Sequence, residues 1–204
     1  MYPFLVVATV VITVLLGLVV YRIGSPKGPR LEDVANLKTP RIVTMPPQKV
    51  LLVTARGDPN VVGKKAFGLL LSTYYKLEGA PKGGPAFKPP RARWPLDPDV
   101  PADEWVGHYA MPIADSVTAL PAVPAKDGLT VELAVWEYGQ VAEILHVGPY
   151  DAEQPAIETL KAFVAELKYR IVGEHEEEYL KGPGMLFAGD PTTYLTMIRY
   201  RVGK

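Results

Sequence analysis

The sequence predicts an α+β domain built from a duplicated βαββ unit, with one transmembrane helix in front of it. Two strand-like apolar runs, residues 49–55 and 141–147, are each followed by a glycine-containing turn and a helical stripe of apolar residues. Two further strand candidates follow each of these helices. The repeat predicts two helices on one face of an antiparallel sheet, with pseudo-twofold symmetry and a cleft where the halves meet.

The composition is that of a globular protein with no bulk charge. The 204 residues suffice for one domain of ordinary size, or two small ones, plus a tail. Basic and acidic residues balance at 22 each, and no zinc finger or basic helical run is present, so we expect no nucleic-acid partner. The absence of cysteine excludes disulfides, thiolate chemistry, iron–sulfur clusters and a lipidated cysteine.

Residues 1–22 are predicted to be a transmembrane anchor, with the lipid bilayer as the partner of residues 3–21. The run from Pro3 to Val20 has no charged residue, and tyrosines bracket it at Tyr2 and Tyr21. About 20 apolar residues suffice for a helix to cross a bilayer. A cleaved signal peptide is the alternative, but the segment lacks an early Lys or Arg and a small-x-small cleavage site.

The orientation of this anchor follows from the charges beside it. Arg22, Lys27 and Arg30 all follow the apolar run, so the positive-inside rule predicts a cytoplasmic C-terminal domain and an external N-terminus. We therefore expect a single-pass protein of the cell (inner) membrane. Residues 23–40 form a linker rich in Gly and Pro, and residues 41–204 form the folded domain.

The first βαββ unit begins with a buried strand, Lys49–Ala55. The turn 57–60 (GDPN) has the chemistry of a helix start. The expected strands after the helix are 91–96 and 105–113. Helical spacing relates the following apolar or small residues: Val62, Ala66, Leu69, Leu70, Thr73 and Leu77.

The second unit repeats this order after an additional strand, 130–136, and a hairpin at 137–140. The strand 141–147 leads into the turn 148–151 (GPYD), and the strands after the helix are 173–181 and 193–202. The helical stripe consists of Ala156, Ile157, Leu160, Phe163, Val164 and Leu167.

The segment 173–180 (GEHEEEYL) carries the most informative alternation in the chain. As a strand, it places His175, Glu177 and Tyr179 on one side. The glutamates at 174, 176 and 178 share the other side, where they are expected to face water. A carboxylate on the apolar face of a strand is costly unless it meets a partner or lines a cavity. The alternative is a glutamate-rich edge strand or helix end that is exposed throughout.

The chain from about residue 41 to 202 resembles a GyrI-like small-molecule-binding domain, a family that includes the effector-binding domains of AraC- and MerR-type regulators. The motifs that carry the resemblance are His146–Asp151 (HVGPYD), Gly173–Leu180 and Gly57–Pro59, with Trp94–Asp97 and Tyr109–Pro112 fitting the first half. The resemblance implies a central apolar pocket whose glutamate meets cationic, lipophilic ligands.

The Glu-x-Tyr pattern assigns this ligand-binding role to Glu177 and Tyr179, with Glu176 or Glu178 left open by the glutamate run. Aromatic side chains would supply cation–π contacts to such a ligand, and we expect Tyr109, Trp94 and Tyr150 among them. The same aromatic residues could instead be ordinary core. Proline-rich inserts at 81–90 and 95–101 can reshape or plug the mouth of the pocket.

The sequence predicts no metal ligand, cofactor or catalytic residue. The three histidines at 108, 146 and 175 lack metal-motif spacing, and His146 is expected to cap the glycine turn through a hydrogen bond. No serine or cysteine nucleophile constellation and no phosphate-binding loop is visible. A helix-turn-helix is also missing from this sequence, which excludes a transcription factor in one chain.

Three functions remain at this point. The first is a membrane-tethered module that binds a lipophilic or cationic small molecule through Glu177 and aromatic walls. The second is a non-catalytic accessory subunit of an integral membrane complex. Its support is the apolar span, in which small residues such as Gly17 permit close helix packing. The third follows from family members that hydrolyse cyclopropanoids, and it uses Glu177 to activate water with Tyr179 or another pocket tyrosine as donor.

Overall fold

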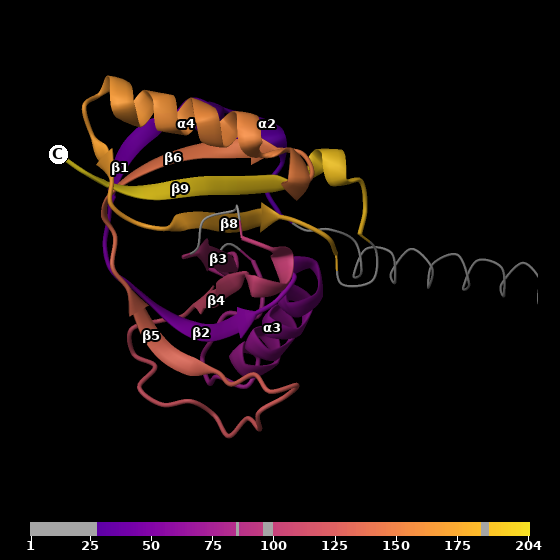
Figure 1. Ribbon diagram of the computed structural model, residues 1–204. Coiled ribbons are helices and arrows are strands. Elements are labelled where there is room, and N and C mark those ends of the chain that lie inside the picture. The colour runs from indigo at the N-terminus through magenta and orange to yellow at the C-terminus, as the bar shows by residue number, and fades with distance from the viewer. Residues whose placement is uncertain (1–27, 85, 96–99, 185–187) are drawn as a thin grey trace, which may run out of the picture.

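A computed structural model describes residues 28–204, apart from 85, 96–99 and 185–187 (Figure 1). The predicted anchor, residues 1–22, and the start of the linker lie outside the described residues. In the part of the chain that the structure describes, no helix has the length and apolar character needed to cross a bilayer.

The domain is one strongly curved antiparallel sheet with a few helices, as the α+β prediction required (Figure 1). The strand order is β1-β6-β9-β8-β3-β4-β2-β5, and the short β7 pairs with β9. The strands are β1 (Arg41–Met45), β2 (Gln48–Arg56), β3 (Arg91–Trp94), β4 (Val106–Pro112), β5 (Glu132–Trp136), β6 (Gly139–Val147), β7 (Arg170–Ile171), β8 (His175–Lys181) and β9 (Leu195–Gly203). The helices are α2 (Leu31–Val34), α3 (Pro59–Tyr74) and α4 (Gln154–Glu166), with 3₁₀ turns η1 (Ala35–Lys38), η2 (Ala102–Glu104), η3 (Tyr150–Ala152) and η4 (Pro191–Thr193).

The strand order has the same arrangement on both sides of the sheet centre. Counted outward from the centre, β8, β9 and β6 on one side correspond to β3, β4 and β2 on the other. The segment β2-α3-β3-β4 occupies one half and β6-α4-β8-β9 the other, and the halves meet where β3 pairs with β8. Each outer strand crosses over, because β1 pairs with β6 and β5 pairs with β2. Strand order does not measure a rotation between the halves, so the duplication with pseudo-twofold symmetry stays a prediction.

Helix α3 begins and packs as its sequence indicates. The Asp58 side chain accepts a hydrogen bond from the backbone N–H of Asn60 at 2.9 Å, and Pro59 occupies the first turn, where a missing N–H costs nothing. The helix buries Ala66, Leu70 and their neighbours against β2 and β4. Leu77, which was expected to continue the helical stripe, is buried beyond the C-terminal end of the helix.

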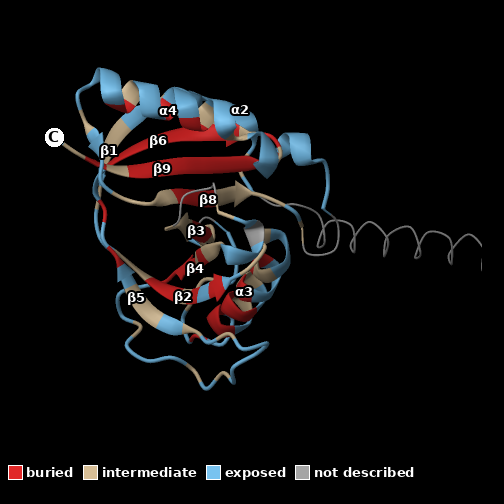
Figure 2. Ribbon diagram, viewed as in Figure 1, coloured by how far each residue is buried: buried red, intermediate tan, exposed pale blue. Residues whose placement is uncertain are grey.

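Helix α4 covers β6 and β9 through Ile157, Leu160 and Val164 (Figure 2). The strand register shows that both helices lie on the same face of the sheet. Residues directly paired across antiparallel strands share a face, and one row of pairs runs Val53, Tyr109, Ala92, Glu177, Ile198 and Ile144. This row begins under α3 and ends under α4. Glu177 therefore lies on the helix-bearing face, between the two helices.

The other face of the sheet corrects one prediction. Glu176 and Glu178 were expected to face water, but only 3% and 6% of their surfaces are exposed. Trp136 of β5 and Tyr138 of the hairpin after it cover the middle of this face. The residues of β8 that alternate toward this face are therefore buried and not exposed to water. Arginines on the neighbouring strands β3 and β9 pair with both carboxylates.

Candidate ligand-binding site

Glu177 lies near the middle of β8, where the two halves of the sheet join. Its neighbours in the register are Ala92 on β3 and Ile198 on β9, and both are fully buried. Glu177 itself is 6% exposed. A carboxylate in such a position needs a hydrogen-bond donor, and Trp94 supplies one by donating its indole Nε1–H to Glu177 Oε1 at 2.5 Å.

Aromatic rings surround this carboxylate on the helix-bearing face. Trp94 meets Tyr109 with 5.7 Å between ring centroids, and Tyr150 meets Tyr179 at 5.4 Å, both edge to face. Phe67 of α3 links the two pairs, at 5.2 Å from Tyr109 and 5.6 Å from Tyr179. The five residues that the sequence predicted for the site thus lie in one cluster. Their role in binding a ligand remains a prediction.

The charge of Glu177 contributes to the raised pKa values of the three tyrosines in the cluster. Burial, and then the charge of Glu177, raise the pKa of Tyr109 to about 12. Burial and the charge and hydrogen bond of Glu177 raise the pKa of Tyr179 well above its ordinary value. The pKa of Tyr150 is raised by burial and by Tyr194, with Glu177 contributing less. These hydroxyls therefore stay protonated near neutral pH, and they can donate to Glu177 or to a ligand.

Three further residues of this cluster, His175, Glu153 and Tyr200, were not assigned to the site from the sequence. His175 Nε2 lies 3.3 Å from Glu177 Oε1 and 3.6 Å from Oε1 of Glu153, which precedes α4. Tyr200 of β9 holds the other ring nitrogen, with 2.8 Å between its hydroxyl and Nδ1. The alternation of β8 had placed His175 on the correct face. No local signal could have found Glu153, because only the packing of α4 on the sheet brings it here.

Glu153 shifts the charge balance of the site. Burial, and then the nearby charge of Glu177, raise the pKa of Glu153 to about 9. At neutral pH the Glu153 carboxyl therefore holds a proton, so that two like charges do not meet in a buried place. A cation that entered the site would meet favourable charge, and an anion would be repelled.

Several buried polar atoms on this face have no hydrogen-bond partner among the described residues. They are the hydroxyl of Tyr109, Oε2 of Glu153, Nε2 of His175 and Oγ1 of Thr196. Thr196 pairs with both Tyr179 and His146 in the sheet, so its hydroxyl belongs to the same face. Buried polar atoms are rarely left unpaired in proteins, so these four atoms leave hydrogen-bonding capacity for an additional partner on this face. Three arginine nitrogens on the opposite face also have no hydrogen-bond partner among the described residues: Arg91 Nε, Arg93 Nη2 and Arg199 Nη1.

Of the two proline-rich inserts, only the first is largely described by the structure. Phe87 of the insert 81–90 packs on Tyr74 at the C-terminal end of α3, with centroids 5.5 Å apart. Most of the insert 95–101 lies outside the described residues, so its effect on the mouth of the site stays a prediction. His146 Nε2 lies 2.9 Å from the carbonyl oxygen of Pro149, which confirms the expected cap of the glycine turn.

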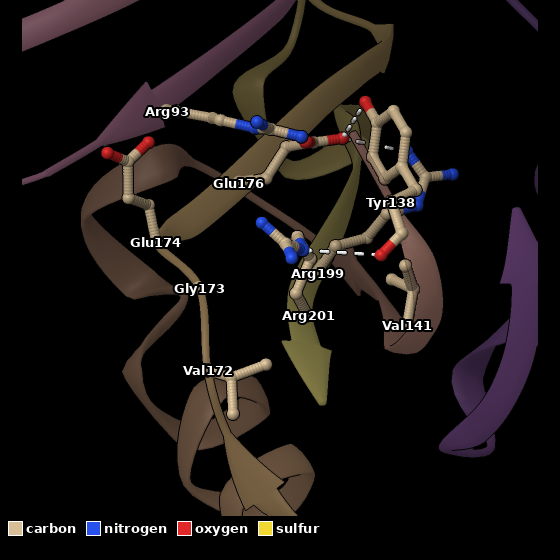
Figure 3. A pocket seen from close by; sticks show the side chains of 9 residues that line it. All are labelled: Arg93, Tyr138, Val141, Val172, Gly173, Glu174, Glu176, Arg199 and Arg201. Carbon is tan, nitrogen blue, oxygen red and sulfur yellow. Dashed lines mark hydrogen bonds and ion pairs between the residues drawn. The ribbon is translucent and has the colours of Figure 1, made fainter. Parts of the chain in front are cut away.

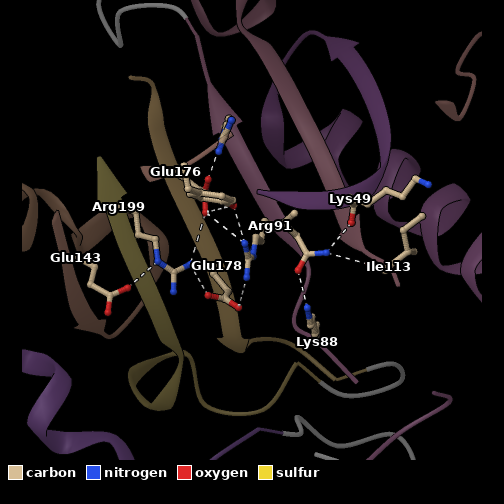
Figure 4. A network of polar contacts seen from close by, with 11 residues as sticks. Lys49, Lys88, Arg91, Ile113, Glu143, Glu176, Glu178 and Arg199 are labelled. Atoms are coloured by element: carbon tan, nitrogen blue, oxygen red, sulfur yellow. Dashed lines mark hydrogen bonds and ion pairs between the residues drawn. The ribbon is translucent and has the colours of Figure 1, made fainter. Parts of the chain in front are cut away.

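The opposite face carries a different kind of polar cluster, which we call the arginine ladder. One row of directly paired residues crosses five strands in alternating charge: Arg93, Glu176, Arg199, Glu143 and Arg41. Glu143 accepts from Arg199 Nε at 2.8 Å (Figure 4). It also accepts from Arg41 Nη2 at 2.6 Å. Glu178 lies in the next row, between Arg199 and Arg91 (Figure 4).

A cavity of about 240 Å³ lies beside this ladder (Figure 3). Its lining includes Arg93, Glu176, Arg199 and Arg201. Tyr138 closes one side, donating its hydroxyl to Glu176 at 2.9 Å (Figure 3). Glu176 also accepts from Arg93, whose guanidinium stacks on Trp136 at 4.0 Å from the ring centroid. These residues bind one another, so the ladder is a structural network and Glu177 on the other face is the better candidate for ligand binding.

Known structures share this fold. A protein from Listeria innocua described as uncharacterized and conserved is 19% identical, with a TM-score of 0.67 over 85% of this chain and 98% of its own. A Listeria innocua protein described as a hydrolase is 18% identical, with the same score over 87% and 100%. The EcmrR C-terminal domain is 15% identical, with a TM-score of 0.57 over 81% and 98%. At these identities the likeness establishes the fold.

The sequence comparisons give a family. A search among curated proteins finds no match to the chain. The family model of the GyrI-like small molecule binding domain matches residues 38–199, which is most of the chain and includes every element from β1 to the greater part of β9. The chain therefore belongs to the GyrI-like small-molecule-binding domain family.

Proposed function

We propose that this protein binds a lipophilic organic cation at Glu177. The observation that carries the proposal is the buried Glu177 carboxylate inside a cluster of aromatic rings. A carboxylate in a place of low polarity attracts a positive charge more strongly than it would in water. The rings add apolar contact area and cation–π attraction, worth about 2 kcal/mol for a desolvated cation.

The exposure of the aromatic residues indicates how a ligand would enter. Tyr109 is fully enclosed, whereas Tyr150 is 37% exposed and Tyr179 is partly exposed. Tyr150 packs on Tyr179, so the aromatic cluster reaches the surface on this side. A ligand that enters between these rings would meet Glu177 at the inner end, where Trp94 orients the carboxylate.

Tetraphenylphosphonium is a suitable probe, because its charge is spread over an apolar surface. Equilibrium dialysis of the full chain in a non-ionic detergent should show saturable binding. The E177Q variant should weaken it at least about tenfold, which corresponds to about 1.4 kcal/mol. E174Q is the matched control, because Glu174 lies on the same segment but is about one-third exposed and outside the aromatic cluster. Equal affinity in the wild type and E177Q, or an equal loss in E174Q, would contradict the proposal.

Hydrolysis is a second candidate, favoured by the Tyr179 hydroxyl beside the Glu177 carboxylate. Glu177 would act as the base that activates water and Tyr179 as the proton donor. One Listeria innocua protein of similar fold is described as a hydrolase. Turnover of an activated cyclopropane that disappears in E177A would support this reaction. Absence of turnover in a wild-type preparation that binds tetraphenylphosphonium would exclude it for that substrate class.

We also propose that residues 3–21 tether the domain to the cell membrane, with residues 40–204 in the cytoplasm. The support is the apolar run and the basic residues that follow it in the sequence. Protease added to right-side-out vesicles should leave residues 40–204 intact. Their digestion would contradict the proposed orientation.

A further inference from the structure

The atoms of Glu153, His175 and Glu177 that face one another form a compact set of metal-ligand donors. One donor atom from each residue lies within 4.8 Å of the other two. The set combines one imidazole nitrogen with two carboxylate oxygens, contributed by β8 and by Glu153, the residue before α4. Imidazole and carboxylate are the usual ligands of catalytic zinc sites, together with an open position.

The distances are those of a coordination polyhedron rather than of hydrogen bonds. His175 Nε2 is 3.3 Å from Glu177 Oε1 and 3.6 Å from Glu153 Oε1. A hydrogen bond from N–H to oxygen spans about 2.7 to 3.2 Å. In a tetrahedral zinc site with bonds of about 2.1 Å, neighbouring ligand atoms are about 3.4 Å apart. Both distances from His175 lie close to that edge length.

The surrounding residues hold the donors in place. Tyr200 contacts His175 Nδ1 at 2.8 Å, so the tautomer with a proton on Nδ1 donates to Tyr200 and leaves a lone pair on Nε2. Such a partner for the second ring nitrogen is usual in metal sites. Trp94 fixes Glu177, and the Glu153 carbonyl accepts from the N–H groups of Ala156 and Ile157 at the start of α4.

A second observation is that some polar atoms of these residues are buried without a hydrogen-bond partner. His175 Nε2 and Glu153 Oε2 are both buried, and neither has a hydrogen-bond partner within the described residues. Glu177 supplies the third donor from a side chain that is more than nine-tenths buried. Of the atoms that face one another across the site, His175 Nε2 is therefore buried and unpaired, and it faces the carboxyl of Glu153, whose other oxygen is unpaired as well. Unpaired buried atoms of this kind indicate an additional partner here.

We propose that Glu153, His175 and Glu177 bind one divalent metal ion, for which Zn²⁺ fits the donors and their spacing best, and that the Glu153 carboxyl releases its proton when the ion binds. Three protein ligands leave a fourth position open. The metal site goes beyond the binding of an organic cation and does not require it. Glu177 belongs to both sites, so Zn²⁺ and tetraphenylphosphonium are expected to compete.

The test is a titration of the full chain, freed of metals by a chelator, with Co²⁺ as a spectroscopic substitute for Zn²⁺. The wild type should bind one equivalent and develop the intense visible bands of a four-coordinate ion, which Zn²⁺ then removes. H175Q and E153Q should each weaken binding at least about 100-fold, since loss of even an outer-shell partner costs 10- to 100-fold. H108Q is the matched control, because His108 and Glu174 form another histidine–carboxylate pair at 3.7 Å that is about one-third exposed.

Tetraphenylphosphonium binding provides the second measurement, and it separates a failed metal site from a misfolded variant. Zn²⁺ should displace the cation from the wild type but not from H175Q, which should still bind it. If the wild type binds no stoichiometric Co²⁺, or if H175Q binds it as tightly, the metal site is refuted while the organic-cation proposal stands. A loss of Co²⁺ binding in H108Q equal to that in H175Q would also refute the assignment.

Discussion

At the scale of single residues, the site depends on donors that hold Glu177 in a buried position. Trp94 does this through one short hydrogen bond, and its ring also forms part of the aromatic wall. Trp105 lies against Trp94 with 5.7 Å between centroids, but its indole N–H donates to the backbone carbonyl of Val100 at 2.8 Å. Trp94 thus donates to a charged acceptor and Trp105 to a neutral one. Comparing variants of the two residues shows how much the charge of the acceptor adds to the stability of the hydrogen bond.

Replacing Trp94 by Phe keeps an aromatic ring and removes the donor to Glu177. We expect the free energy of unfolding to fall by about 1.5 to 3 kcal/mol, because the lost hydrogen bond has a charged acceptor. W105F is the control, and it should cost about 1 kcal/mol for a neutral hydrogen bond. Urea unfolding of both variants measures the difference. A larger cost for W105F than for W94F would show that the Trp94–Glu177 bond has no special weight.

Gly107 allows Tyr109 its position in the site. A Cβ atom added at Gly107 would lie 2.6 Å from the Tyr109 ring, and that ring is 2% exposed and enclosed by α3. G107A should destabilise the domain by about 1 to 3 kcal/mol through overpacking and should weaken tetraphenylphosphonium binding by displacing the ring. The control G68A meets nothing within 4 Å on the exposed side of α3 and should stabilise it by up to about 1 kcal/mol. Unchanged stability in G107A would contradict the packing described.

At the scale of elements, β8 divides two polar environments between its two faces. Glu177 and Tyr179 face the helices, and Glu176 and Glu178 face the arginine ladder. Burial alone would raise the pKa of Glu178, but the charges and hydrogen bonds of Arg199 and Arg91 outweigh it and lower the pKa below its ordinary value. The ion pairs of Glu178 with Arg199 and Arg91 therefore stabilise the sheet only while the Glu178 carboxylate is ionised.

This gives a pH dependence with a defined sign. Glu178 in the unfolded chain takes up its proton near pH 4.3, whereas the folded domain resists protonation to lower pH. Its contribution is complete above about pH 4.3 and is lost as the pH falls toward the lower pKa of the folded state. E178Q should lower the free energy of unfolding at pH 7 by about 3 to 5 kcal/mol, because two buried guanidinium groups lose a partner.

Denaturant unfolding between neutral and acid pH measures this contribution, with E174Q as the control at a partly exposed position next to β8. Stability should fall less steeply with acid in E178Q than in the wild type or E174Q. Equal acid dependence in E178Q and the wild type would show that Glu178 does not carry the effect.

The sequence predicted the helix-bearing side of β8 correctly and the other side wrongly. Alternation alone placed Glu177 and Tyr179 together, since side chains two apart in a strand share a face. It could not reveal that the ladder side is covered, because Trp136 and Tyr138 come from a hairpin some 40 residues away and the pairing arginines from β3 and β9. The short edge strands β1 and β7 were not predicted, since their pairing partners lie far away in the sequence.

At the scale of the whole molecule, the two halves of the sheet are needed to assemble one site. Trp94 and Tyr109 come from the first half, and Glu153, His175, Glu177, Tyr179 and Tyr200 from the second. They meet because β3 pairs with β8 at the centre of the sheet. The family resemblance predicted five of the aromatic and acidic members. Glu153 and Tyr200 required the packing of α4 and β9, which no local pattern specifies.

In the proposed function, the charge of Glu177 recognises the charge of the ligand. The most direct measurement is a cycle of four dissociation constants, for tetraphenylphosphonium and neutral triphenylphosphine oxide with the wild type and E177Q. We expect the wild type to prefer the cation at least about tenfold, or 1.4 kcal/mol, and E177Q to bind the two probes about equally. An undiminished preference for the cation in E177Q would contradict this role of Glu177. Another group of the protein would then recognise the charge of the ligand.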